Sequence, residues 1–146
     1  MDSGVQQRRS RRYLRPGWLL RRVANPLIAR LGMAPVLAVR GRKTGRWHTV
    51  PVNVLEYGGQ RYLVAPRGET DWVRNLRAAG GGELRWRGRV ERFRAVEVPD
   101  AEKPPLIEAY LQRWGAQVRA HFAALPDPAD HPVFRLEPVE RAAGQA

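Results

Sequence analysis

The sequence predicts an α+β fold in which about six mainly antiparallel strands close into a barrel flanked by helices. Short apolar runs rich in β-branched residues recur from Val36 onward, which is typical of strands. Glycines separate two pairs of these runs at the spacing of tight hairpins. Two helical patterns interrupt the series. Because consecutive hairpins form a meandering sheet, closure into a barrel is the expected outcome.

The chain of 146 residues has the length of one domain that can bury a core. We predict a flexible basic arm at 1–15, a single domain at 16–140 and a flexible tail at 141–146. Within the domain, apolar residues at three- and four-residue steps over 17–31 predict a basic amphipathic helix. Gly32 ends this predicted helix, and Pro26 kinks it or splits it in two.

Six strands are predicted, at 36–40, 49–56, 61–65, 83–87, 90–98 and 133–136. Gly58 and Gly59 join the second strand to the third, and Gly88 joins the fourth to the fifth.

Two further helices are predicted, from Thr70 or Asp71 to about residue 79 and from Asp100 to about residue 124. Both starts carry a side chain that can accept a capping hydrogen bond. The longer helix has an apolar stripe formed by Leu106, Ile107, Tyr110, Leu111, Trp114 and Val118.

The composition narrows the chemistry. With 26 Lys and Arg against 14 Asp and Glu, the net charge of +12 favours anionic partners. The chain has no cysteine, its three histidines lack metal-ligand spacing, and its two serines lie in the arm. We therefore predict no metal site, and the hard chemistry would belong to a bound cofactor. No apolar run is long enough to span a bilayer or to act as a secretory signal, so we expect a cytoplasmic protein.

Two segments suit a bound anion. The loop at 41–46 places two glycines among three cations between predicted strands. Residues 65–72 run from a strand end into a helix start, where backbone N–H groups lack partners. An ordinary basic turn and an ordinary capped connection remain open as alternatives.

Four segments carry a resemblance to a known family: VRGRKTGR at 39–46, TVPV at 49–52, VAPRG at 64–68 and WVRNL at 72–76. In this order and spacing they resemble the deazaflavin-dependent nitroreductase family, over about residues 36–94.

The resemblance implies a split β-barrel that binds the deazaflavin coenzyme F420, in preference to FMN. The implied activity is hydride transfer to an electron-poor acceptor such as a quinone, a nitro compound or an activated alkene. The implied coenzyme contacts comprise a loop for the phosphate and acidic tail (Arg42, Lys43, Thr44, Gly45), a strand beneath the coenzyme (His48, Thr49, Val50, Pro51, Val52, Asn53), a segment at the ring edge (Val64, Ala65, Pro66, Arg67) and a closing helix start (Asp71, Trp72, Asn75).

For the substrate pocket, the resemblance assigns only two residues, Tyr110 and Trp114. No residue is assigned as proton donor, and solvent, His48 and Tyr110 are all retained as candidates.

Three other interpretations are kept. The barrel could bind a lipid or another apolar ligand without catalysis. It could bind nucleic acid, with stacking residues Trp47, Tyr62, Trp86 and Phe93, although no specific nucleic acid is expected. Residues 8–31 combine arginines with an amphipathic pattern, which predicts peripheral contact with an anionic membrane at its inner face or packing of the helix on its own barrel. The oligomeric state is left open.

Overall fold

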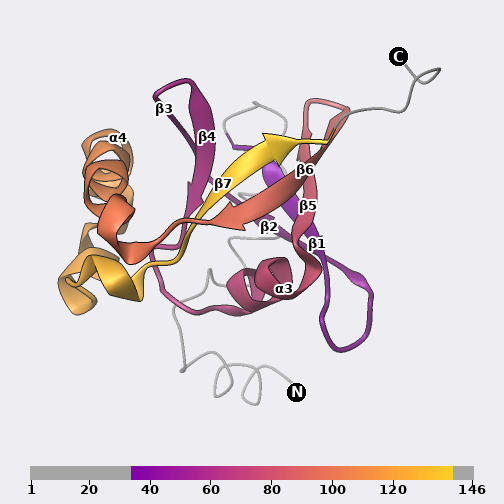
Figure 1. Ribbon diagram of the computed structural model, residues 1–146, viewed down its shortest axis with the longest axis horizontal. Coiled ribbons are helices and arrows are strands. Elements are labelled where there is room, and N and C mark those ends of the chain that lie inside the picture. Colours follow the sequence, from indigo (N-terminus) through magenta and orange to yellow (C-terminus); the bar gives the residue numbers. More distant parts are fainter. Residues whose placement is uncertain (1–33, 140–146) are drawn as a thin grey trace, which may run out of the picture.

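The computed structural model describes residues 34–139, so the predicted arm, amphipathic helix and tail lie outside the described residues. Within this range, seven strands form one sheet, with two α-helices and two 3-10 turns beside it (Figure 1). The strands are β1 Val36–Arg40, β2 Trp47–Pro51, β3 Val54–Tyr57, β4 Gln60–Val64, β5 Gly81–Trp86, β6 Arg89–Glu97 and β7 Val133–Pro138. The helices are α3 Asp71–Ala79 and α4 Lys103–Ala124, with 3-10 turns η2 Asp100–Glu102 and η3 Pro128–Asp130.

The sheet curls into a half-barrel. Its strand order is β2-β1-β5-β6-β7-β4-β3, and every neighbouring pair is antiparallel. β2 and β3 lie at opposite edges, yet only Val52 and Asn53 separate them along the chain. Because so short a link spans at most about 11 Å, the sheet must bend until its edges approach. The α+β split-barrel prediction is confirmed.

The prediction of a single strand at 49–56 is wrong, because the structure divides these residues between β2 and β3. Pro51, at the end of β2, has no N–H with which to continue a ladder. The next residue turns away, since the Val52 N–H donates to Pro35 O at 3.0 Å. The side chain of Asn53 then reaches α4, where Nδ2 lies 3.4 Å from the Tyr110 hydroxyl.

Two core clusters fill the molecule. The first lies between the inner face of the sheet and α3, which packs against β1, β5 and β6. Its buried members are Leu37, Val39, Leu63, Ala65, Val73, Leu76, Leu84, Phe93, Phe134 and Leu136. The second lies beneath α4 and comprises Leu55, Val64, Val98, Leu106, Ile107, Tyr110, Val118 and Val133. No helix within residues 34–139 is long and apolar enough to cross a membrane.

The helix starts are not capped by side chains as predicted. Thr70 is the N-cap of α3 but makes no side-chain capping bond, and its buried Oγ1 has no partner among residues 34–139. Asp100 begins the η2 turn, and its carboxylate instead pairs with Lys103 Nζ at 2.8 Å. The C-terminus of α3 follows a common pattern, because Gly80 adopts φ 76° and its N–H donates to Leu76 O at 2.8 Å.

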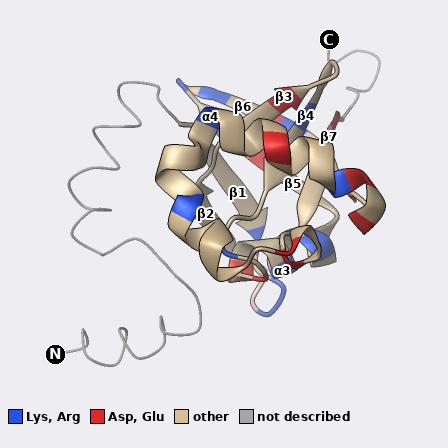
Figure 2. Cartoon of the chain, turned by 90° about the vertical axis from the view of Figure 1, so that its left-hand side faces the viewer, with Lys and Arg blue, Asp and Glu red and all other residues tan. Residues whose placement is uncertain are grey.

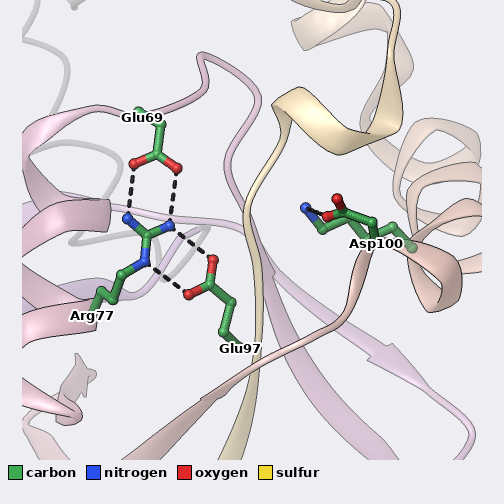
Figure 3. A network of polar contacts seen from close by, with 5 residues as sticks. Glu69, Arg77, Glu97 and Asp100 are labelled. Carbon is green, nitrogen blue, oxygen red and sulfur yellow. Dashed lines mark hydrogen bonds and ion pairs between the residues drawn. The ribbon is translucent and has the colours of Figure 1, made fainter.

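Arg77 ties the last turn of α3 to β6 (Figure 3). Its guanidinium donates to both carboxylate oxygens of Glu97 at 2.8 Å and to both of Glu69 at 2.9 Å. Hydrogen bonding to these two carboxylates raises the pKa of Arg77, and the bond from Arg77 lowers the pKa of Glu69. Four of the five N–H donors of this guanidinium are therefore bonded to carboxylates.

Candidate functional site

The loop between β1 and β2 is closed by its own hydrogen bonds. The Gly41 N–H donates to Arg46 O at 2.7 Å, and the Gly45 N–H donates to Gly41 O at 2.8 Å. Gly45 has φ 75°, a left-handed conformation that glycine adopts without strain. The Arg46 N–H also donates to Thr44 Oγ1 at 3.2 Å. The loop is thus a compact turn whose charged side chains extend into solvent.

Arg42 fastens this loop to the first turns of α3. Its N–H donates to Asn75 Oδ1 at 3.0 Å, and its Nη1 donates to the same oxygen at 2.7 Å. Its Nη2 lies 3.6 Å from Asp71 Oδ1. Asn75 is 4% exposed, so its side chain is held inside the fold. The predicted contacts Arg42, Asp71 and Asn75 are therefore brought together, and they bond to one another.

Two other cations of the loop have no acidic partner within the part of the chain that the structure describes. Lys43 and Arg46 are exposed, and no carboxylate of the described chain lies within ion-pair distance of either. Figure 2 shows this loop, with blue segments, projecting below α3. The partnerless Oγ1 of Thr70 lies at the start of the same helix. The residues present therefore fit an anionic group such as a phosphate or a carboxylate.

The side chains of residues 48–53, which were predicted to lie beneath the coenzyme, point in more than one direction. The imidazole of His48 lies over Gly41, where a Cβ atom would come within 2.6 Å of its Nε2. Thr49 and Pro51 are exposed on the edge strand, whereas Val50 and Val52 pack against the first core cluster. The side chain of Asn53 bonds to residues of α4, with Nδ2 3.3 Å from Gln117 Oε1.

The segment predicted at the ring edge is held by its backbone. Val64 and Ala65 are buried, and Pro66 and Arg67 are half-buried. The Ala65 N–H donates to Pro132 O at 2.9 Å, and Ala65 O lies 2.9 Å from His131 Nδ1. This rigid backbone fixes where the segment can meet a ligand.

Sequence reasoning missed the part played by His131. Its ring is fully buried, its Nε2 lies 2.6 Å from Leu125 O, and it stacks on Phe122 with centroids 4.0 Å apart. No residue pattern indicates this contact, because its partners come from two separate segments, the residue after β4 and the C-terminal end of α4.

Tyr110 and Trp114, assigned to the substrate side, are residues of α4 that pack in the second core cluster. Tyr110 is 2% exposed, and burial raises the pKa of its hydroxyl, with the hydrogen bond from Asn53 opposing. The Trp114 ring lies 5.0 Å from the Tyr110 ring, at an irregular residue of α4 with φ −121° and ψ 16°. Trp72 packs against Phe134 in the first core cluster. The structure thus groups the loop with the start of α3 and places Tyr110 and Trp114 in a different cluster.

His121 is a second residue that no sequence pattern indicates. It is half-buried on α4, and its buried Nδ1 has no partner within the described part of the chain. Burial, and next the nearby Arg67 and His131, lower the pKa of His121.

The chain was compared with solved structures. It resembles the protein Atu2129 of Agrobacterium tumefaciens, of unknown function, with a TM-score of 0.57 and 19% identity; 86% of this chain covers 57% of that one. It also resembles an F420-H2 dependent reductase, FDR-A, with a TM-score of 0.53 and 22% identity, over 70% of this chain and 93% of that one. These likenesses show the fold.

The comparison with families is more informative. No curated protein matches the chain. The sequence profile described as F420H(2)-dependent quinone reductase, however, matches residues 15–124. This match covers most of the chain, including the cationic loop, both helices and six of the seven strands. The protein therefore belongs to the F420H(2)-dependent quinone reductase family, a group of oxidoreductases whose cofactor is coenzyme F420.

Proposed function

We propose that the protein transfers a hydride from reduced coenzyme F420 to an electron-poor acceptor, with a quinone as the first candidate and a nitro compound or activated alkene as the others. Membership of the family supports F420-dependent oxidoreduction. The observation that carries the site is the loop at 41–46, where Arg42 anchors the loop to α3 while Lys43 and Arg46 have no acidic partner within residues 34–139.

The residues of the chain would bind and orient the coenzyme. Lys43 and Arg46 would donate to its phosphate and acidic tail, and the backbone at the start of α3 would add N–H donors. When bound, the reduced deazaflavin supplies the hydride. Because the loop is closed and anchored before binding, the cations are held near their final positions, which limits the entropy lost when the coenzyme binds.

The test is a fluorescence titration of oxidised F420 with the wild-type chain and Lys43→Ala. A charged hydrogen bond contributes roughly 1.5 to 3 kcal/mol, so the variant should bind about 10- to 100-fold more weakly. Arg87→Ala is the control, since it removes one exposed cation from the β5–β6 turn, at the opposite end of these strands from the loop. Absence of quenching by the wild type at micromolar F420 would contradict the proposal and favour a barrel that carries an apolar ligand.

The acceptor is tested separately, by following oxidation of reduced F420 with a soluble quinone, a nitro compound and an enone. Turnover with the quinone at the highest kcat/KM is expected. A chain that binds F420 but oxidises it with none of the three would contradict the acceptor class alone.

The nucleic-acid interpretation is disfavoured by burial. Of its four stacking residues, Phe93 is 2% exposed and Tyr62 is half-buried against the second core cluster. Trp47 is exposed, but Arg40 and Arg85 lie 4.3 and 5.2 Å from its ring. Burial therefore removes two of the four aromatic residues from base stacking and leaves Trp47 and Trp86 exposed.

We also propose a cytoplasmic location with peripheral contact at the inner face of the membrane through residues 8–31, which lie outside the described residues. The support is the basic amphipathic pattern of the segment. Co-sedimentation with anionic liposomes should fall when the chain begins at Pro16. Equal recovery of both chains in the supernatant would remove the arm from membrane binding.

A further inference from the structure

The hairpin that joins β5 to β6 exposes apolar side chains on both of its faces, because Trp86 pairs with Arg89 whereas Val90 pairs with Arg85. Arg87 and Gly88 form its turn, with φ values of 52° and 76° that fit a tight two-residue connection. On either side of the turn, Trp86 is 43% exposed and Val90 is 59% exposed. Val139 is 45% exposed, and its N–H donates to Arg92 O at 3.4 Å, which places it beside the same hairpin. Three of the five exposed large hydrophobic residues in the described chain therefore share this end of the sheet.

The same hairpin is cationic. Arg87, Arg89 and Arg92 are exposed, and within residues 34–139 no carboxylate lies at ion-pair distance from any of them. The one acidic residue of the hairpin tip, Glu91, accepts from Arg61 Nη1 at 2.9 Å. The Arg87 guanidinium lies 4.8 Å from the centre of the Trp86 ring. We call Trp86, Arg87, Arg89, Val90, Arg92 and Val139 the hairpin patch.

The hairpin patch lies where both ends of the described chain leave the fold. Val36 pairs with Arg85, one residue before Trp86, and the described chain begins two residues before Val36. The first described residue, Ala34, therefore lies close to this hairpin. In Figure 1 the hairpin stands at the top of the view, away from α3 and from the cationic loop at the bottom.

We propose that the hairpin patch docks on an anionic membrane surface. Tryptophan favours the membrane–water interface, and arginines beside it are attracted to acidic lipid headgroups. Exposed valines can enter the boundary between the headgroups and the acyl chains of a membrane. Neither a nucleic-acid backbone nor an acidic peptide in water would give these valines an apolar environment. The tight turn presents a convex tip, the shape suited to insertion rather than to holding a strand of nucleic acid. This contact goes beyond the proposed reductase activity and does not depend on it.

Co-sedimentation of the full chain with phosphatidylcholine vesicles, with and without phosphatidylglycerol, tests the proposal. Trp86→Ser combined with Val90→Ser should lower the fraction bound to anionic vesicles by about fivefold or more, because it removes the inserted surface. Tyr57→Ser is the matched control, since Tyr57 is 42% exposed beside the other tight hairpin, between β3 and β4. Arg87→Ser with Arg89→Ser should also lower binding, whereas Arg113→Ser with Arg119→Ser, which removes two cations from α4, should not.

Each variant is first shown to be folded by its circular dichroism melt and its F420 affinity, neither of which should change. The proposal is overturned if the Trp86 and Val90 variant binds anionic vesicles like the wild type, or if the wild type binds neutral and anionic vesicles equally. Conversion of a wild-type dimer to a monomer by the same variant would also overturn it, because the patch would then be an interface between copies of the chain. A loss of F420 reduction with unchanged vesicle binding would bear on the reductase proposal alone.

Discussion

The two ends of helix α3 hold arginines in opposite ways. At its C-terminal end, Arg77 is bound on two sides by the carboxylates of Glu69 and Glu97 (Figure 3). At its N-terminal end, Arg42 meets an amide oxygen and only one carboxylate, at 3.6 Å. The loop that Arg42 anchors adds Lys43, with no acidic partner in the described chain.

This difference separates cations that stabilise the fold from cations that can bind a ligand. Each carboxylate of the Arg77 network neutralises charge that an anionic coenzyme would otherwise meet. At the N-terminal end of α3, the oxygen that anchors Arg42 belongs to the neutral amide of Asn75. The loop is therefore held in place while the electrostatic potential around it stays positive. Net charge alone does not reveal this, because both regions contribute arginines to the same total of +12.

The largest effect is expected from Asn75→Leu, which breaks the anchor at the N-terminal end. It leaves the partly buried N–H and guanidinium of Arg42 without their acceptor, which costs about 1 to 3 kcal/mol of stability. F420 affinity should fall as well, because the loop is no longer held against α3. Thermal unfolding and F420 titration measure the two effects.

Asn75→Asp is the control for that experiment, since it keeps an oxygen where Arg42 donates. It should retain most of the stability but weaken F420 binding, because it adds a negative charge beside the loop. Equal F420 affinity in the wild type and both variants would show that the anchor plays no part in coenzyme binding.

A smaller effect is expected from Arg77→Met, which removes the cation at the C-terminal end. The three side chains of the network are between 37% and 47% exposed, so solvent screening limits the loss of stability to about 1 kcal/mol. F420 affinity should not change. A clear drop in affinity would mean that the two ends of α3 are not functionally distinct.

The smallest effect is expected in how the difference in Tm between the wild type and Arg77→Met depends on pH. Arg77 lowers the pKa of Glu69 in the folded state, so this bond stabilises the protein above the ordinary pKa of 4.5 and is lost as the pH falls through the lowered value. The difference in Tm between the wild type and Arg77→Met should therefore be full at pH 7 and shrink below pH 4.5. A constant difference down to pH 3 would show that Glu69 contributes nothing.

The local elements of the fold were predictable from the sequence. Gly58 with Gly59, and Gly88, form the two tight hairpins at the predicted positions, because glycine sets the turn wherever it lies. The helices at 71–79 and 103–124 follow their apolar periodicity. The β5 strand starts two residues earlier than predicted, since Gly81 and Gly82 pair closely with β6 despite their low strand preference.

Part of the candidate site was also predictable from the sequence. The sequence marked the loop at 41–46 and the start of α3, because glycines among cations and a helix start favour anions wherever they occur. It also named Arg42 and Asn75, but as separate contacts of one coenzyme. In the structure the two are bonded to one another across 33 residues of sequence.

By itself, then, the sequence determined the local structure: the hairpins, the helices, the cationic loop and the family to which its motifs belong. Tertiary structure alone decided that residues 49–56 are divided between two strands at opposite sheet edges, that Tyr110 of α4 is buried in the second core cluster, and that Arg42 bonds to Asn75. The physical reason is that turns and periodicity depend on neighbours along the chain, whereas burial and hydrogen-bond partners depend on which distant segments the curled sheet brings together.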